Sequence, residues 1–145
     1  MKIIFQFFII GDNTKNETIR EKIMLMHNEV KTNEFLRITK RVTNELLLLG
    51  YNFKLKGTQY LLESIVHIYT KNDMNLLENL EKNVYKHIAT QNSKKTLNIK
   101  TSIIKATNYV YNYQDENKLY EYFSIEIKIT PKLVISTILL IGRIP

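Results

Sequence analysis

The chain contains no cysteine, and only two prolines and four glycines among its 145 residues. Without cysteine it has no disulfide and no thiolate metal site, which is typical of a protein from a reducing cytosol. The scarcity of glycine and proline, together with abundant leucine, isoleucine, lysine and glutamate, favours helices over a sandwich of short strands. A hydrophobic content of 44% is ordinary for a folded chain. We therefore expect a mainly α, multi-helix domain.

Long hydrophobic runs are also missing. Residues 3–10 and 133–141 are the longest apolar stretches, and both fall far short of the roughly 20 residues that a bilayer crossing requires. Polar residues follow the first stretch, where a signal peptide would have a small-residue cleavage site. We expect no membrane partner and a cytoplasmic protein.

The residue patterns of common enzyme classes are absent as well. The sequence has no P-loop and no glycine-rich dinucleotide turn, and its histidines, His27, His67 and His87, are scattered. His67 is expected in the core or at its boundary, because no carboxylate or second histidine stands at ligand spacing. We therefore expect neither an enzyme nor a bound cofactor or metal.

What the chain does contain is a long segment of one charge sign. Acidic residues are absent between Glu81 and Asp115, and this window holds His87 and six lysines: Lys82, Lys86, Lys94, Lys95, Lys100 and Lys105. The whole chain carries a net charge of +7 and has a pI near 9.5. Duplex DNA favours such clustering, because lysines that neutralise phosphates release counterions. The window therefore indicates an anionic partner such as nucleic acid.

Helical periodicity fills most of the chain from residue 35 onward. The predicted elements begin with a helix over 35–49 closed by Gly50 and a core helix over 57–69, whose apolar residues lie on nearly all its sides. A helix over 73–89, a turn at 90–93 and a helix over 93–113 capped by Asn92 or Ser93 follow. Residues 120–130 alternate as a strand or an extended loop does, and an apolar helix over 132–141 follows. The apolar residues of that last helix indicate either ordinary packing or a dimer contact.

The helix predicted over 93–113 separates its side chains by face. Ile99, Ile103, Ala106 and Val110 form an apolar stripe for the core. Another face is wholly polar at the same spacing, with Lys94, Asn98, Thr101, Lys105, Asn108 and Asn112. Surface helices usually carry Glu–Lys pairs, whereas lysines and amides are the types that contact phosphates and base edges. The pattern favours a DNA-reading helix; a solvated face that happens to lack acids is the alternative.

The N-terminal residues are expected to form a short strand-helix appendage. Residues 3–10 have the composition of a strand, residues 17–30 have helical periodicity, and Lys31–Asn33 is the predicted boundary. A lone strand leaves both edges unpaired, so this piece docks on the rest, pairs with another chain or stays mobile. The predicted domains are therefore 1–33 and 34–145.

Several residues resemble a known family. Ile38-Thr39, Gly50 and the run Leu55-Lys56-Gly57-Thr58-Gln59-Tyr60-Leu61-Leu62-Glu63-Ser64-Ile65 are similar to the entry helices of the C-terminal DNA-binding domain of the stage-zero sporulation response regulator. Tyr85, Ile88 and Ala89, followed by Ile99, Ile103 and Ala106, match its helix-turn-helix without a gap. The resemblance covers about 35–113 well and 119–141 loosely. It implies a helix-turn-helix DNA-binding domain that takes part in transcription regulation.

The sequence departs from this family at two places. Lys86 stands where the family has a proline, so the helices before and after it are expected to fuse or to bend less sharply. The family's base-facing positions fall on Asn98, Lys100, Thr101, Ile104 and Lys105, and none of them keeps the family residue. Arginine–guanine recognition is therefore lost, and asparagine suits adenine instead.

Residues 1–33 resemble the beginning of a receiver domain. The first strand, the turn at Gly11-Asp12-Asn13 and the first helix are similar, but the later aspartate that accepts phosphate is missing. Asp12 alone is no phosphorylation site. The resemblance implies a regulator with a truncated receiver that aspartyl phosphorylation does not control.

These observations lead to two functional hypotheses. The first is a transcriptional regulator that binds double-stranded DNA, with a homodimer or a tandem dimer as possible states on DNA. Its predicted contact residues are Lys82, Lys86, Ser93, Lys94, Lys95, Asn98, Lys100, Thr101, Ile104 and Lys105. The second is a protein-interaction module that pairs with a full-length relative and antagonises it. The lysine-rich window favours the first, because dimer blocking needs no unopposed positive charge.

Overall fold

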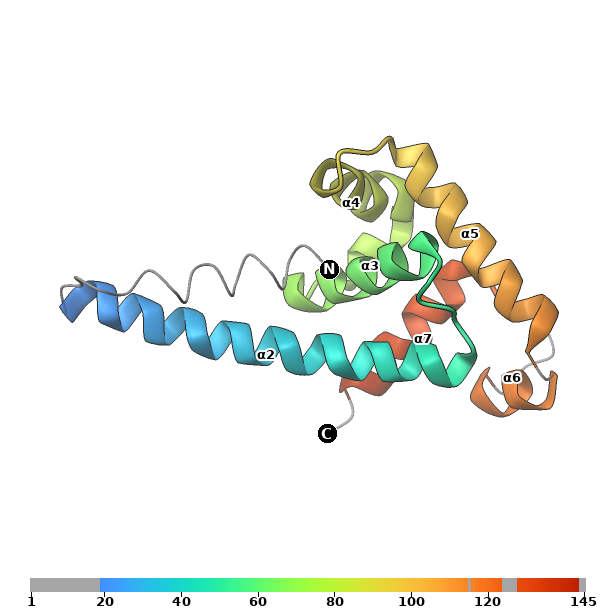
Figure 1. Cartoon of the computed structure of the whole chain (residues 1–145), viewed down its shortest axis with the longest axis horizontal. Coiled ribbons are helices and arrows are strands. Elements are labelled where there is room, and N and C mark those ends of the chain that lie inside the picture. The colour runs from blue at the N-terminus through green and yellow to red at the C-terminus, as the bar shows by residue number, and fades with distance from the viewer. Residues whose placement is uncertain (1–18, 115, 124–127, 144–145) are drawn as a thin grey trace. The chain divides into compact units, whose positions relative to one another are not determined.

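The computed structural model describes residues 19–114, 116–123 and 128–143, and all regular elements in these ranges are helical (Figure 1). They are α2 (Ile19–Leu49), α3 (Lys56–Lys71), the 3-10 helix η1 (Met74–Asn79), the π-helix η2 (Glu81–Tyr85), α4 (Lys86–Gln91), α5 (Thr96–Tyr113), α6 (Glu116–Phe123) and α7 (Pro131–Arg143). The prediction of a mainly α chain is confirmed. The strand predicted over 3–10, with Asp12, lies outside the described residues.

Helix α2 is longer than the sequence pattern predicts. It continues through Lys31–Asn33, where a boundary was expected, because no glycine or proline interrupts residues 19–49. The chain divides into two compact units at a different place, Met1–Lys40 and Arg41–Pro145. The assignment of 1–33 and 34–145 as separate domains stays a prediction, and the following description concerns the second unit.

The C-terminus of α2 ends as predicted, at a glycine with a left-handed backbone. Gly50 has φ 94°, its N–H donates to the carbonyl of Leu47, and the N–H of Tyr51 donates to that of Leu46. The side-chain amide of Gln114 donates to the carbonyl of Leu49 over 3.0 Å. The end of α5 is thereby fixed to the end of α2.

Helix α3 is the centre of the second unit. It packs against α5 and α7 (Figure 1), and its apolar side chains Leu61, Leu62, Ile65 and Ile68 are fully buried, as the all-round apolar pattern predicts. At Gly57 the backbones of α3 and α5 approach so closely that an added Cβ would lie 1.9 Å from the carbonyl oxygen of Ser102. Only glycine allows this crossing of the two helices.

The segment between α3 and the turn forms a continuous helical path of changing pitch. The 3-10 helix η1 leads into the π-helix η2 and then into α4, so the predicted fusion of these helices is confirmed. The N–H of Lys86 donates to the carbonyl of Glu81, which is the five-residue bond of a π turn. Proline has no N–H to make this bond, so the lysine at position 86 explains the continuity.

The strand or extended loop predicted over 120–130 is wrong for its first part. Residues 120–123 belong to α6, and the Tyr122 hydroxyl donates to the Glu45 carboxylate over 2.7 Å. Burial, and then Glu45, raise the pKa of Tyr122 above its usual range. A tertiary contact of this kind outweighs a short alternating pattern. Residues 124–127 lie outside the described ranges.

The last helix follows the prediction closely. Pro131 begins α7, and Thr130 caps it by accepting a bond from the N–H of Leu133. Ile135, Ile138 and Leu139 are all buried within the unit. Ordinary packing therefore explains these three residues, whereas Leu140 of the same helix is 60% exposed.

Candidate nucleic-acid interface

The turn between α4 and α5 is built differently from the prediction. Neither Asn92 nor Ser93 caps the N-terminus of α5: Asn92 ends α4, Ser93 has φ 54°, and the residue before α5 is Lys95. The helix consequently begins at Thr96 rather than at residue 93. The side chain of Lys95 forms no capping bond, while its carbonyl accepts from the N–H groups of Asn98 and Ile99 in the first turn of α5.

One partly buried interaction fixes this turn to α3. The amide of Asn92 donates to the Glu63 carboxylate over 3.0 Å and to the carbonyl of Ile88 over 2.9 Å. Glu63 is only 7% exposed. A buried carboxylate needs hydrogen-bond partners, so this contact holds the turn in one position.

We expect Asn92→Ala to lower the free energy of unfolding by about 2 kcal/mol, because it removes a hydrogen bond to a buried charged group. Urea denaturation followed by circular dichroism measures the change. Asn98→Ala is the control, because Asn98 is an exposed asparagine in the first turn of α5, and this variant should leave the stability unchanged. Equal stabilities of the two variants would contradict the role of Asn92.

The two faces of α5 are arranged largely as predicted. Ile99, Ile103, Ala106 and Val110 are all buried. Lys94, Asn98, Thr101, Lys105 and Asn112 are exposed, and Asn108 is half-buried. The predicted polar positions are therefore accessible, but exposed apolar side chains lie on the helix beside them.

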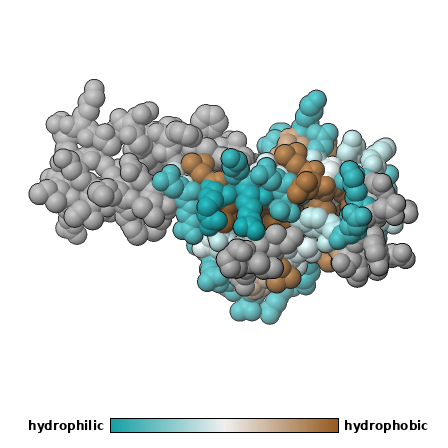
Figure 2. Space-filling model, turned by 90° about the horizontal axis from the view of Figure 1, so that it is seen from below, coloured by the Kyte–Doolittle hydropathy of each residue, from teal (hydrophilic) through white to brown (hydrophobic). Residues whose placement is uncertain are grey.

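Exposed apolar side chains are concentrated on α5. Among the described residues eight large hydrophobic side chains are exposed, and five belong to α5: Leu97, Ile104, Tyr109, Tyr111 and Tyr113. Figure 2 shows one face of the molecule, where hydrophilic side chains cover much of the described surface and hydrophobic ones lie between them in separate groups. Leu97, 65% exposed, was missed at the sequence level because only its polar neighbours were counted.

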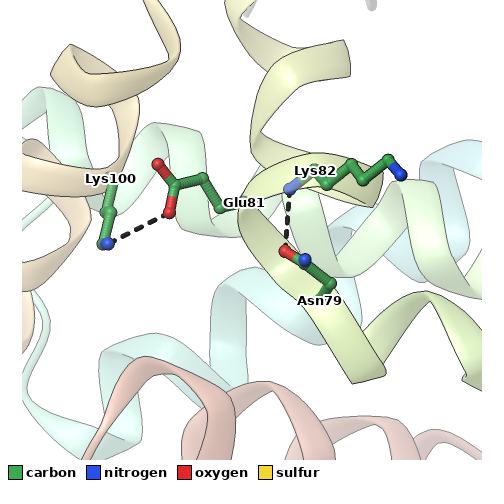
Figure 3. A network of polar contacts seen from close by, with 4 residues as sticks. All are labelled: Asn79, Glu81, Lys82 and Lys100. Carbon is green, nitrogen blue, oxygen red and sulfur yellow. Dashed lines mark hydrogen bonds and ion pairs between the residues drawn. The ribbon is translucent and has the colours of Figure 1, made fainter.

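Lys100 lies at the edge of the outward face and has an acidic partner. Its ammonium group is 3.1 Å from the Glu81 carboxylate of η2, and both side chains are partly exposed (Figure 3). Lys82 extends away from this pair in the same view, while its backbone N–H donates to the Asn79 side chain. The positive charge of Lys100 is therefore paired with an acidic residue that precedes the acid-free segment.

The other predicted contact residues remain accessible. The side chains of Lys82, Lys86, Ser93, Lys94, Lys95, Asn98, Thr101, Ile104 and Lys105 are all exposed. They come from η2, α4, the turn and α5, which follow one another along the chain. The predicted contact residues are therefore accessible, and Lys100 is the one that already forms an ion pair, with Glu81.

A pair of histidines joins α3 to α4. The rings of His67 and His87 are stacked with their centroids 4.1 Å apart. Burial, then the charges of His87 and Lys71, lower the pKa of His67 to about 4. His67 is half-buried at the boundary of the core, as expected from the sequence, but its neighbour His87 was not foreseen.

The lowered pKa of His67 predicts an acid-sensitive stability. A histidine in the unfolded chain has a pKa near 6.5, so His67 binds a proton more tightly in the unfolded chain than in the folded one. The neutral, folded His67 therefore contributes fully to the free energy of unfolding above pH 6.5, and this contribution is lost as the pH falls towards 4. We expect the melting temperature to fall over this range, and less steeply in His67→Gln. Parallel pH profiles of the two proteins would contradict the assignment.

Two further properties of the described residues limit the kinds of site they can form. None of the described helices is long and apolar enough to cross a membrane. The described histidine, aspartate and glutamate residues form no group of three that could hold a metal ion.

A buried α3, a short helix α4, a tight turn and an amphipathic α5 with an exposed lysine-rich face define a helix-turn-helix DNA-binding domain. Residues 42–139 match the family model described as sporulation initiation factor Spo0A C terminal. The chain belongs to this family, whose domain is a DNA-binding effector domain of a sporulation response regulator. No curated protein matches the chain.

Proposed function

We propose that the chain is a transcriptional regulator that reads duplex DNA by inserting α5 into the major groove. Asn98 and Thr101 face the base edges with Lys105 beside them, and Lys94 and Lys95 bind phosphates near the N-terminus of α5. Lys82, Lys86 and Ser93 contact the DNA backbone from η2, α4 and the turn.

The accessible face of α5 carries this proposal. Its inner face is buried against the unit, which leaves the lysine and amide side chains free to meet a ligand. The N-terminus of α5, which has no side-chain cap from Lys95, favours a phosphate beside Lys94 and Lys95 through the helix dipole. Lys100 is excluded from the base-reading set in this proposal, because Glu81 already binds it.

Fluorescence-anisotropy titration of the full chain with a random-sequence duplex at several salt concentrations tests the proposal. We expect binding at low salt that weakens steeply as salt is added, because each phosphate contact releases counterions. Selection from a random duplex library then identifies the preferred site. Absence of binding to any duplex at low salt would contradict the proposal.

Control by aspartyl phosphorylation is not part of the proposed mechanism. Helix α2 runs without interruption from Ile19 into the DNA-binding region, so residues 19–49 contain no strand that could present an acceptor aspartate. Incubation with acetyl phosphate should therefore leave the DNA affinity unchanged.

Pairing with a full-length relative receives less support. The terminal helix that suggested such pairing packs Ile135, Ile138 and Leu139 inside the unit and leaves Leu140 as its exposed large apolar side chain among the described residues. Size-exclusion chromatography with a full-length relative checks this directly, and a stable mixed complex would favour the antagonist function instead.

A further inference from the structure

Two apolar side chains are exposed in the N-terminal half of α5. Leu97 is 65% exposed and Ile104 is 39% exposed, and Thr101 lies exposed between them. With 3.6 residues per turn, steps of four and then three residues return to the same side of a helix. The three side chains therefore form one row, which is here named the methyl row.

The polar groups of α5 flank the methyl row on its two sides. Asn98 and Lys105, seven residues apart, share one edge, while Lys100 lies on the opposite edge and is bound by Glu81. A face that only bound phosphates would gain nothing from an exposed leucine and an exposed isoleucine. Water contact with these apolar groups is unfavourable, so the row gains free energy when a ligand covers it.

The ligand must combine apolar groups with negative charge. Lysines surround the row at the N-terminal end of α5 and on its edge, as described for Lys94, Lys95 and Lys105. In the major groove, thymine is the standard DNA base that presents a methyl group, and apolar side chains contact that methyl. An amide beside the row, as in Asn98, suits the adenine of the same or a neighbouring base pair.

We infer that the methyl row of Leu97, Thr101 and Ile104 recognises thymine methyl groups, so that the preferred site of this chain is rich in A·T pairs at the positions under α5. The inference rests on the proposed function, because it requires α5 to lie in the major groove. It adds Leu97 as a specificity-determining residue and gives Ile104 a direct role.

Replacement of single thymines by deoxyuridine tests this inference. A duplex is first selected from a random library with the full chain, and each thymine is then exchanged in turn, which removes one methyl group and keeps the base pair. We expect a loss of affinity of about fourfold at one or two thymines per site, as for one buried methyl group. At the other thymines the affinity should be unchanged.

Variants show which side chains contact the methyl group. Leu97→Ala or Ile104→Ala should weaken binding to the thymine duplex and abolish the difference between thymine and deoxyuridine at the sensitive position. Leu140→Ala is the matched control, because it truncates a leucine of similar exposure (60%) on α7. It should keep both the affinity and the thymine preference.

The outcomes separate this inference from the proposed function. Sequence-preferring binding without any effect of deoxyuridine, or with an effect that survives in both Leu97→Ala and Ile104→Ala, would overturn the inference and leave the DNA-binding function intact. A selected site without thymine would also overturn the inference alone. No binding to any duplex at low salt would overturn both.

Discussion

Gly57→Ala is expected to lower the free energy of unfolding by about 3 kcal/mol or more, the upper range for overpacking a filled site. The added Cβ would lie 1.9 Å from the carbonyl oxygen and 2.4 Å from the carbonyl carbon of Ser102, where a real Cβ is never found. These are backbone atoms of α5, so relief of the clash requires a shift of the whole helix. Such a loss is a large part of the 5–15 kcal/mol of a typical domain.

Thermal denaturation of Gly57→Ala measures this effect, and a fall in the melting temperature of more than about 10 °C is expected for a unit of this size. Lys56→Ala is the control, since Lys56 is the exposed neighbour of Gly57 on the same helix. The two variants should differ strongly. A melting temperature for Gly57→Ala close to that of the unaltered chain would show that α3 and α5 do not cross as closely as described.

The double variant Lys94→Ala/Lys95→Ala is expected to weaken binding to every duplex alike, by roughly tenfold to a hundredfold near physiological salt. Both side chains are exposed beside the uncapped N-terminus of α5, where a phosphate is also favoured by the helix dipole. Loss of two phosphate contacts should reduce the slope of log affinity against log salt by about two units.

Salt-dependent anisotropy titrations of this double variant give the slope directly. Lys118→Ala/Lys132→Ala is the matched control, because it removes the same charge from exposed positions on α6 and α7. A small, general electrostatic loss is expected there, with the slope nearly unchanged. If both double variants lose affinity and slope equally, the lysines act only through net charge and not as placed contacts.

Periodicity in the sequence predicted the elements whose contacts repeat along one helix. The stripe of Ile99, Ile103 and Ala106 is buried as expected, because a helix of 18 residues allows several turns to confirm the same face. The glycine at position 50 likewise predicted the end of α2 through its left-handed backbone alone. Both features depend on residues that are close together in the chain, so they can be predicted from the sequence.

Features that depend on distant contacts were not predictable in this way. The start of α5 follows from the turn that Glu63 holds through Asn92, 29 residues away, so the usual capping preference of Ser93 misled the prediction. Lys100 was taken as a free charge because its partner Glu81 lies 19 positions earlier. Residues 120–123 form part of a helix despite their alternating pattern, because Tyr122 contacts Glu45, which is also distant in the sequence.

The same limit explains the outward face of α5. Counting polar positions identified Asn98, Thr101 and Lys105 as exposed, but left out Leu97, which is more than half exposed in the structure. An apolar residue near the start of a helix is ordinarily assigned to the core. Only the placement of the neighbouring helices shows that this leucine is left uncovered by the described residues.

The claim that α5 reads DNA sequence is tested most directly by the double variant Asn98→Ala/Thr101→Ala, titrated against the selected duplex and against a shuffled duplex of the same composition. The account predicts that the preference for the selected duplex falls by at least tenfold, since each lost base contact costs about 1–3 kcal/mol, while binding to the shuffled duplex is retained. Asn44→Ala, an exposed asparagine on α2, should keep the preference. An unchanged preference in the double variant would contradict the account, because a different surface would then read the bases.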